Sequence, residues 1–213
     1  MEEVSAEIPT SLSIEYPDRK LDRLTTFFRP IVAIPILIIL GSLAGTQFFW
    51  EHGPWTWDWY LGVSFIVGPT ALMIIFKQKY PRWWFDWNLH LARFATRVVT
   101  FLALMTDTYP ATDDEQGVHL ELHYPDVSVE LEWWMPIVKW FLAIPHYVVL
   151  FFLNTAATMV VIIAWFSILF TGRFPERLFH FVEEVFHWNL RVQAYAFLML
   201  TDKYPGFSFD GWK

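Results

Sequence analysis

The chain has 213 residues, enough for one domain or two small ones, and 55% of them are hydrophobic. Aromatic residues make up 20% of the sequence, including 13 Trp and 21 Phe, whereas only 17% are charged; this balance is typical of a protein that faces lipid and its interface. The net charge of −7 argues against nucleic-acid binding, which needs a basic face. Because the chain has no Cys, disulfides, thiolate nucleophiles and Cys-based metal sites are excluded.

Apolar and polar residues alternate at 12–16 and again at 118–124, which predicts two short extended segments. Two isolated strands seldom persist alone. We therefore expect these segments to pair with each other, or to pack across the amphipathic helices as a small cap on the cytoplasmic side.

All 15 Lys and Arg residues lie outside two apolar windows, residues 30–76 and 140–172. A membrane span needs roughly 20 apolar residues. The first window therefore predicts two spanning helices, at about 26–48 and 59–76. They would be joined by the Trp-rich, turn-forming segment 49–59, which carries the only two acidic residues of this window.

The segment at about 83–105 is predicted to form an amphipathic helix. Its ionisable side chains recur at helical spacing (i, i+4, i+7, i+11), namely Asp86, His90, Arg93 and Arg97. The simplest interpretation is a helix that lies on the bilayer with this face in water. The alternatives are a shared polar cavity, a docking surface for another subunit, or a third, partly polar span.

The second window is predicted to form a helical hairpin that turns near residues 153–155. One helix through the whole window would be about 50 Å long at ~1.5 Å per residue, much longer than a ~30 Å hydrocarbon core. Two short spans at about 134–152 and 156–170 therefore fit better.

A second amphipathic helix is predicted at about 176–200, with the same spacing and the same alternatives as the first. Its ionisable face consists of His180, Glu184, His187 and Arg191, with Glu183 beside them.

Four short motifs occur twice in the same order, which predicts two tandem repeats, residues 1–113 and 114–213. Each repeat would hold an extended segment, a hairpin and an amphipathic helix. Because a hairpin crosses the membrane an even number of times, the repeats would be parallel, unlike the inverted repeats of many transporters. The paired motifs begin at Tyr16 and Tyr124, Ala33 and Ala143, Phe76 and Phe170, and Leu104 and Met199.

The second copy carries Ala-Ile-Pro-His from Ala143, Leu-Phe-Thr-Gly-Arg-Phe-Pro from Leu169 and Leu-Thr-Asp-Lys-Tyr-Pro-Gly-Phe from Leu200. Together these motifs resemble a prokaryotic membrane family known as domain of unknown function 4389. The resemblance is best over residues 121–209, and residues 13–110 resemble a more divergent copy. It implies a helical integral membrane protein and brings no activity or catalytic residues with it.

His146 is the weak candidate for a cofactor-binding residue, because an ionisable side chain next to Pro145 in an apolar helix is expensive unless it has a partner. Structural hydrogen bonding is the first interpretation; ligation of a cofactor and a proton or ligand pathway are the alternatives. The first copy has Ile36 at this place. The histidines of the two amphipathic helices lack a metal-binding motif, so no metal site and no cofactor are predicted.

Basic residues gather just outside both windows, among them Arg29, Lys77, Lys139 and Arg173. Since such residues accumulate on the cytoplasmic side, we expect both termini and both amphipathic helices inside the prokaryotic cytoplasmic membrane. The segment 51–58 and the turn at Asn154 would lie outside.

The Thr-Asp pairs at 106–107 and 201–202 are expected to form local turns rather than catalytic sites. The sequence contains no Ser-His-Asp set, phosphate-binding loop or dinucleotide fingerprint. We therefore expect an all-α membrane protein without catalytic residues, acting as an accessory, scaffolding or assembly subunit. Its partners would be the lipid bilayer and other membrane subunits or further copies of itself. A small transporter or channel component is the first alternative, and a haem- or lipid-binding membrane protein is the second.

Overall fold

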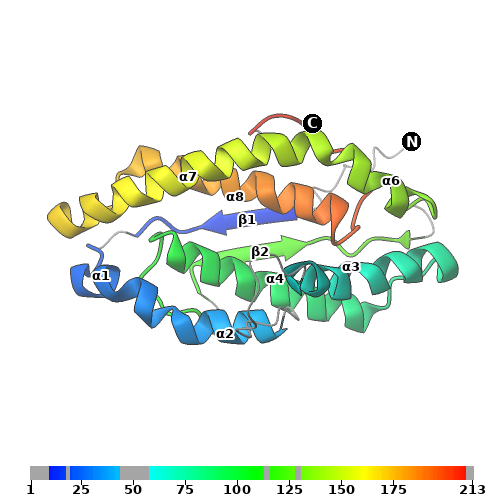
Figure 1. Ribbon diagram of the computed structural model, residues 1–213, viewed down its shortest axis with the longest axis horizontal. Helices are drawn as coiled ribbons and strands as arrows, with labels where there is room; N and C mark the ends of the chain where they lie inside the picture. Colours follow the sequence, from blue (N-terminus) through cyan, green and yellow to red (C-terminus); the bar gives the residue numbers. More distant parts are fainter. Residues whose placement is uncertain (1–9, 18–19, 44–57, 113–115, 128–130, 210–213) are drawn as a thin grey trace, which may run out of the picture.

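The computed structural model describes residues 10–17, 20–43, 58–112, 116–127 and 131–209, with backbone alone for 58–66 (Figure 1). A two-stranded antiparallel sheet lies at its centre. Strand β1 (Thr10–Ile14) pairs with β2 (Val118–Leu122), so that Leu12 lies opposite Leu120. The expectation that the two extended segments pair is therefore confirmed.

Two amphipathic helices, α4 (Arg82–Leu102) and α8 (Glu176–Ala196), pack against the sheet. Helix α4 contacts β2, and α8 contacts β1. Both helices lie where the ionisable spacing predicts them. The strands therefore cross over with respect to the predicted repeats, because β1 packs on the inner helix of the second half and β2 on the inner helix of the first half (Figure 1).

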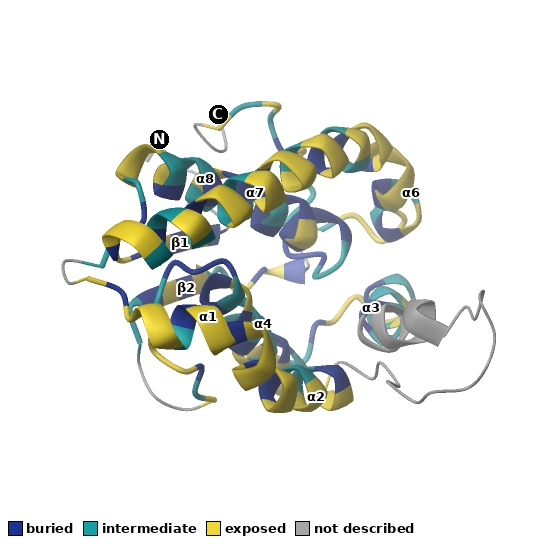
Figure 2. Cartoon of the chain, turned by 60° about the vertical axis from the view of Figure 1, so that its left-hand side comes forward, coloured by how far each residue is buried: buried dark blue, intermediate teal, exposed yellow. Residues whose placement is uncertain are grey.

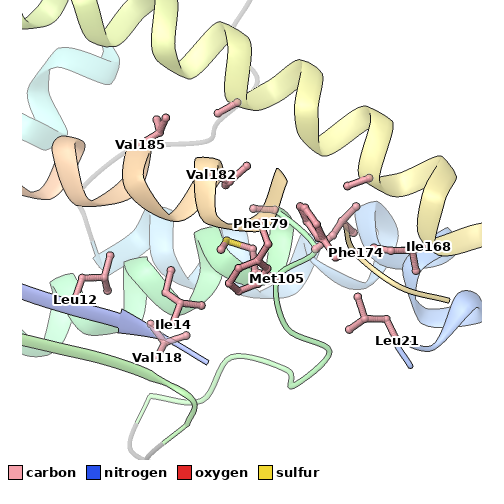
Figure 3. Close-up of a cluster of buried hydrophobic side chains, with 14 of the residues drawn as sticks. Leu12, Ile14, Leu21, Met105, Val118, Ile168, Phe174, Phe179, Val182 and Val185 are labelled. Carbon is pink, nitrogen blue, oxygen red and sulfur yellow. The ribbon is translucent and has the colours of Figure 1, made fainter. Parts of the chain in front are cut away.

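The outer helices are α1 (Arg23–Val32), α2 (Ile34–Leu43), α3 (Asp58–Lys77), α6 (Met135–Leu142) and α7 (Ile144–Thr171). Helix α2 packs on α4 and α7 on α8, whereas α1 contacts α7 and α3 contacts α6. The largest buried cluster joins the sheet to α7 and α8. In it Leu12, Ile14 and Val118 face Phe179 and Val182 of α8 (Figure 3).

Two helix breaks occur where the sequence analysis predicts continuous helices. The expected span 26–48 is interrupted at Ala33, where α1 and α2 meet at 43°, and the expected span 134–152 is interrupted at Ala143. Each break is followed by Ile-Pro. A proline has no N–H to donate to the carbonyl four residues earlier, and its ring clashes with that carbonyl, so the helix bends.

The predicted turn near residues 153–155 is wrong, because α7 runs unbroken through it for 28 residues, about 42 Å at ~1.5 Å per residue. The polar residues there are satisfied without a turn. Asn154 exchanges side-chain hydrogen bonds of 2.9 and 3.2 Å with Asn189 of α8. The hydroxyls of Thr155 and Thr158 donate to carbonyls one turn back.

Within the described residues, α7 is the one helix long and apolar enough to cross a membrane by itself, and α1 with α2 qualifies as a bent pair. Length and composition alone are weak evidence for a membrane. Of the expected hairpin loop at 49–59, residues 49–57 lie outside the described residues, and 58 and 59 begin α3. Because α7 is continuous, the second half lacks the hairpin from which an even number of crossings is expected.

Two tyrosine hydroxyls tie the strand segments to distant helix ends. Tyr16 donates to the carbonyl of Phe174, and Tyr124 donates to the carbonyl of Tyr80, both at 2.6 Å.

Tyr16→Phe and Tyr124→Phe should each cost about 1 kcal/mol of unfolding free energy and lower the thermal midpoint in detergent by roughly 2–4 °C. Tyr109→Phe, at an exposed ring, is the control; an equal loss there would contradict the assignment.

Candidate functional site

A buried ion pair holds α1 to the chain that follows α4. Arg29 is 2% exposed and pairs with Asp107. Its guanidinium also donates to the carbonyls of Phe101 and Thr106, at 2.7 and 2.8 Å, and lies over the Phe101 ring. The second carboxylate oxygen of Asp107 accepts the backbone N–H of Asp22.

A second buried ion pair holds α6 to the chain that follows α8. Lys139 is fully buried, and its Nζ lies 2.7 Å from Asp202 and over the ring of Tyr195. The second oxygen of Asp202 accepts the backbone N–H of Glu132 at 2.6 Å. Each contact of this pair has a counterpart in the first.

Both aspartates follow a tight turn with an unusual backbone. Leu104 and Met199, three residues before Asp107 and Asp202, have φ values of 65° and 55°. Such values are uncommon for residues other than glycine. The turn reverses the chain at the end of each inner helix, which brings the carboxylate back to the basic residue of α1 or α6.

The sequence patterns predict neither ion pair. They indicate flanking charges at Arg29 and Lys139 and local turns at both Thr-Asp pairs. The threonine hydroxyls do accept backbone N–H groups two residues later, at 3.1 and 3.2 Å, but the aspartates reach across the fold. The available signal was the basic residue four positions before each Ala-Ile-Pro, combined with the duplicated Thr-Asp.

The chemistry of these pairs is structural. Removing one partner of a buried pair leaves an uncompensated charge, which costs several kcal/mol. Burial, with smaller contributions from Asp202 and Tyr204, raises the pKa of Tyr195 to about 12, so this ring beside Lys139 stays neutral at physiological pH.

His146 is fully buried at the start of α7 in an aromatic enclosure. Its Nδ1 accepts the indole N–H of Trp188 at 3.2 Å, and its ring stacks on Phe207 at 4.0 Å and lies 5.0 Å from Tyr204. The Pro205 backbone lies against the same ring. This arrangement supports structural hydrogen bonding, the first interpretation of this residue.

The first half of the chain places two purely apolar side chains in the corresponding environment. Ile36 follows Ala-Ile-Pro as His146 does, and it is buried in one cluster with Phe94 of α4. A hydrogen-bonded pair in one half thus matches a packed pair in the other.

The ionisable residues that recur at helical spacing along α8 form a stripe, and its members are divided between solvent and interior. His180 and Glu184 are exposed, whereas Glu183 accepts the N–H of Ile14 in β1 at 3.3 Å and contacts His180 at 3.1 Å. Burial lowers the pKa of His187; Arg191 acts in the same direction, while Glu183 and Glu184 oppose it. Arg191 is buried and donates to the Ser208 carbonyl at 2.7 Å.

The stripe of α4 is divided in the same way. Asp86 and His90 are exposed. Arg93 donates to the Leu120 carbonyl of β2 at 2.9 Å, and Arg97 is buried and donates to the Ala111 carbonyl at 3.0 Å. The inner members of both stripes therefore hold the fold together, and the outer members remain accessible. In the described part of the chain, no three His, Asp or Glu side chains gather as a metal site would require.

An apolar cavity of about 340 Å³ lies where α1, α7 and the end of α4 meet. Its lining consists of Thr26, Arg29, Pro30, Leu102, Leu104, Val161, Ile162, Trp165 and Phe166.

Comparison with known families gives a match within the second half of the chain. Residues 135–208 match the family described as Domain of unknown function (DUF4389). The match spans α6, α7 and α8 and includes Lys139, His146 and Asp202. It confirms the expected resemblance for this segment, whereas a copy at residues 13–110 stays a prediction. No curated protein and no solved structure matches the chain.

Asp202→Asn should destabilise the protein by about 3–5 kcal/mol, because it leaves the buried Lys139 charge without a counter-charge. The amide keeps an oxygen that can accept the Glu132 N–H. Adding Lys139→Met should recover much of this loss. Thermal unfolding in detergent measures both effects. Asp86→Asn, at an exposed carboxylate, is the control and should stay within about 0.5 kcal/mol of the parent. No recovery in the double variant would contradict the pairing.

His146→Ile alone should cost about 1–3 kcal/mol, because it leaves the Trp188 N–H buried without its acceptor. The double variant His146→Ile/Trp188→Phe copies the first half and should recover part of the loss. Unfolding of the four proteins gives the coupling energy. A stoichiometric haem or metal that is lost with His146 would instead overturn the structural role.

Proposed function

We propose that this chain is a non-catalytic integral membrane protein that serves as an accessory, scaffolding or assembly subunit of a larger membrane complex. The observation that carries the proposal is the reversed placement of apolar and charged side chains. Large hydrophobic side chains are exposed on the outer helices, which carry much exposed surface (Figure 2). Arg29 and Lys139, by contrast, are buried. A water-facing monomer rarely exposes so continuous an apolar surface.

The exposed apolar side chains lie on two pairs of outer helices, α1 with α2 and α6 with α7. On α1 and α2 they include Leu24, Phe27, Phe28, Ile31, Ile34, Ile38 and Ile39. On α6 and α7 they include Ile137, Phe141, Val148, Phe151, Phe152, Met159, Ile162, Ile163, Phe166 and Phe170. We propose that lipid covers both pairs of helices.

Two tandem repeats are part of the proposal. Corresponding contacts support them: the two buried ion pairs, the two tyrosine hydroxyls at 2.6 Å, and the Ala-Ile-Pro breaks. The crossed strands support them as well, since β1 contacts α8 and β2 contacts α4. An ancestral unit that paired with a second copy of itself explains this exchange.

The scaffolding role rests on the outer members of the two stripes. Asp86, His90, His180 and Glu184 are exposed and offer charge-complementary contacts to a partner. A lipid-binding role is the second candidate, favoured by the apolar cavity of about 340 Å³ beside α1 and α7.

Reversing the charge of the two exposed carboxylates, Asp86→Lys and Glu184→Lys together, should leave the chain in the membrane fraction but weaken copurification of its partners at least fivefold. Glu183 is left unchanged because it holds β1. Mass spectrometry of native detergent extracts measures the loss, with Glu132→Lys as the control. Unchanged recovery of every partner would count against the stripes as the docking surface.

A further inference from the structure

We propose that the molecule lies in one leaflet of the bilayer with α7 along the membrane plane, so that the outer helices enter the lipid and the sheet faces water. The proposal rests on the membrane role above and specifies its geometry. It differs from a spanning arrangement, in which α7 would run from one side of the membrane to the other.

The sheet excludes a spanning α7. One face of the sheet is polar and exposed, and consists of Ser11, Ser13, His119 and Glu121. The other face packs in one cluster with Ala157, which lies near the middle of α7. If α7 spanned the bilayer, this exposed polar face would lie at the depth of the hydrocarbon core.

The strand edges make that position worse. A two-stranded sheet has two outer edges, and open edges facing lipid do not occur in the hydrocarbon core. At these edges the structure places charged groups: Glu183 on the N–H of Ile14 and Arg93 on the carbonyl of Leu120. Charged groups at mid-membrane depth cost several kcal/mol each. Rotating α7 into the membrane plane moves the sheet and these groups to the water.

The positions of the basic residues also favour an in-plane α7. Arg23 donates to the Phe170 carbonyl at the C-terminal end of α7, and Arg177 follows at the start of α8. Arg82 lies at the opposite end, beside Tyr124. A spanning α7 would separate these groups across the bilayer, against the tendency of basic residues to stay on one side. An in-plane α7 keeps both ends on the same side.

The length and surface of α7 agree with this orientation. At about 42 Å, it exceeds a ~30 Å core and would need a tilt of roughly 45°, beyond the usual range of about 0–40°. Its outward apolar side chains extend from Ile144 to Phe170. An in-plane helix can bury such a face about 5–10 Å deep.

Sidedness tests the proposal directly, because the chain has no native Cys. Glu132→Cys and Arg177→Cys mark the two ends of α7, and His119→Cys marks the outer face of the sheet; all three positions are exposed. In intact cells an impermeant maleimide should label none of them, and after lysis it should label all three. Labelling of one end from outside and of the other only after lysis would overturn the in-plane orientation.

Depth gives a second readout in vesicles of phosphatidylethanolamine and phosphatidylglycerol. Spin labels at Val148, Met159 and Phe170 lie eleven residues apart, so they share one face of α7. Collision with oxygen and with a water-soluble nickel complex should place all three at similar depth. A spanning helix would instead put position 159 about 16 Å deeper than the other two.

Flotation separates the two proposals. Failure of the parent protein to float with these vesicles would overturn the membrane role itself, as would a lipid-free oligomer that covers the apolar face with a second copy. Flotation together with ends on opposite sides would overturn only the in-plane orientation.

Discussion

The fold depends on placing two cations where water cannot reach them. Neither Arg29 nor Lys139 could remain buried without the carboxylate that the chain supplies after the following inner helix. Each aspartate also accepts a backbone N–H from the segment before the cation. One carboxylate therefore positions an outer helix, the segment that leads into it and the end of an inner helix.

Once the cations are held inside, the outer surface is free to be apolar. Helices α1 and α6 turn Arg29 and Lys139 inward, and much of their aromatic and aliphatic surface is exposed. The sheet has the opposite polarity, with Leu12 and Leu120 inside and Ser13 and Glu121 outside. The molecule thus has a polar face at the sheet, which suits water, and an apolar surface along its outer helices, which suits lipid.

Elements governed by local periodicity could be predicted from the sequence, and elements governed by distant contacts could not. The spacing from Asp86 to Arg97 is visible within four turns, and so is the alternation that forms β1. The unbroken α7 could not be predicted, because Asn154 looks like a turn residue until Asn189 satisfies its amide. Likewise, Arg29 and Asp107 are 78 positions apart, so no short stretch of sequence predicts that they form an ion pair.

The crossed strands have a consequence for synthesis. Thr10 pairs with Leu122, and Ile14 takes its edge contact from Glu183 of α8, so β1 leaves the ribosome long before either partner exists. During that interval its backbone is an unpaired edge, open to pairing with other chains. Helix α1 likewise waits for α7, which covers one of its sides. The first half of this chain therefore completes its fold only when the second half arrives, and elongation rate becomes a determinant of yield.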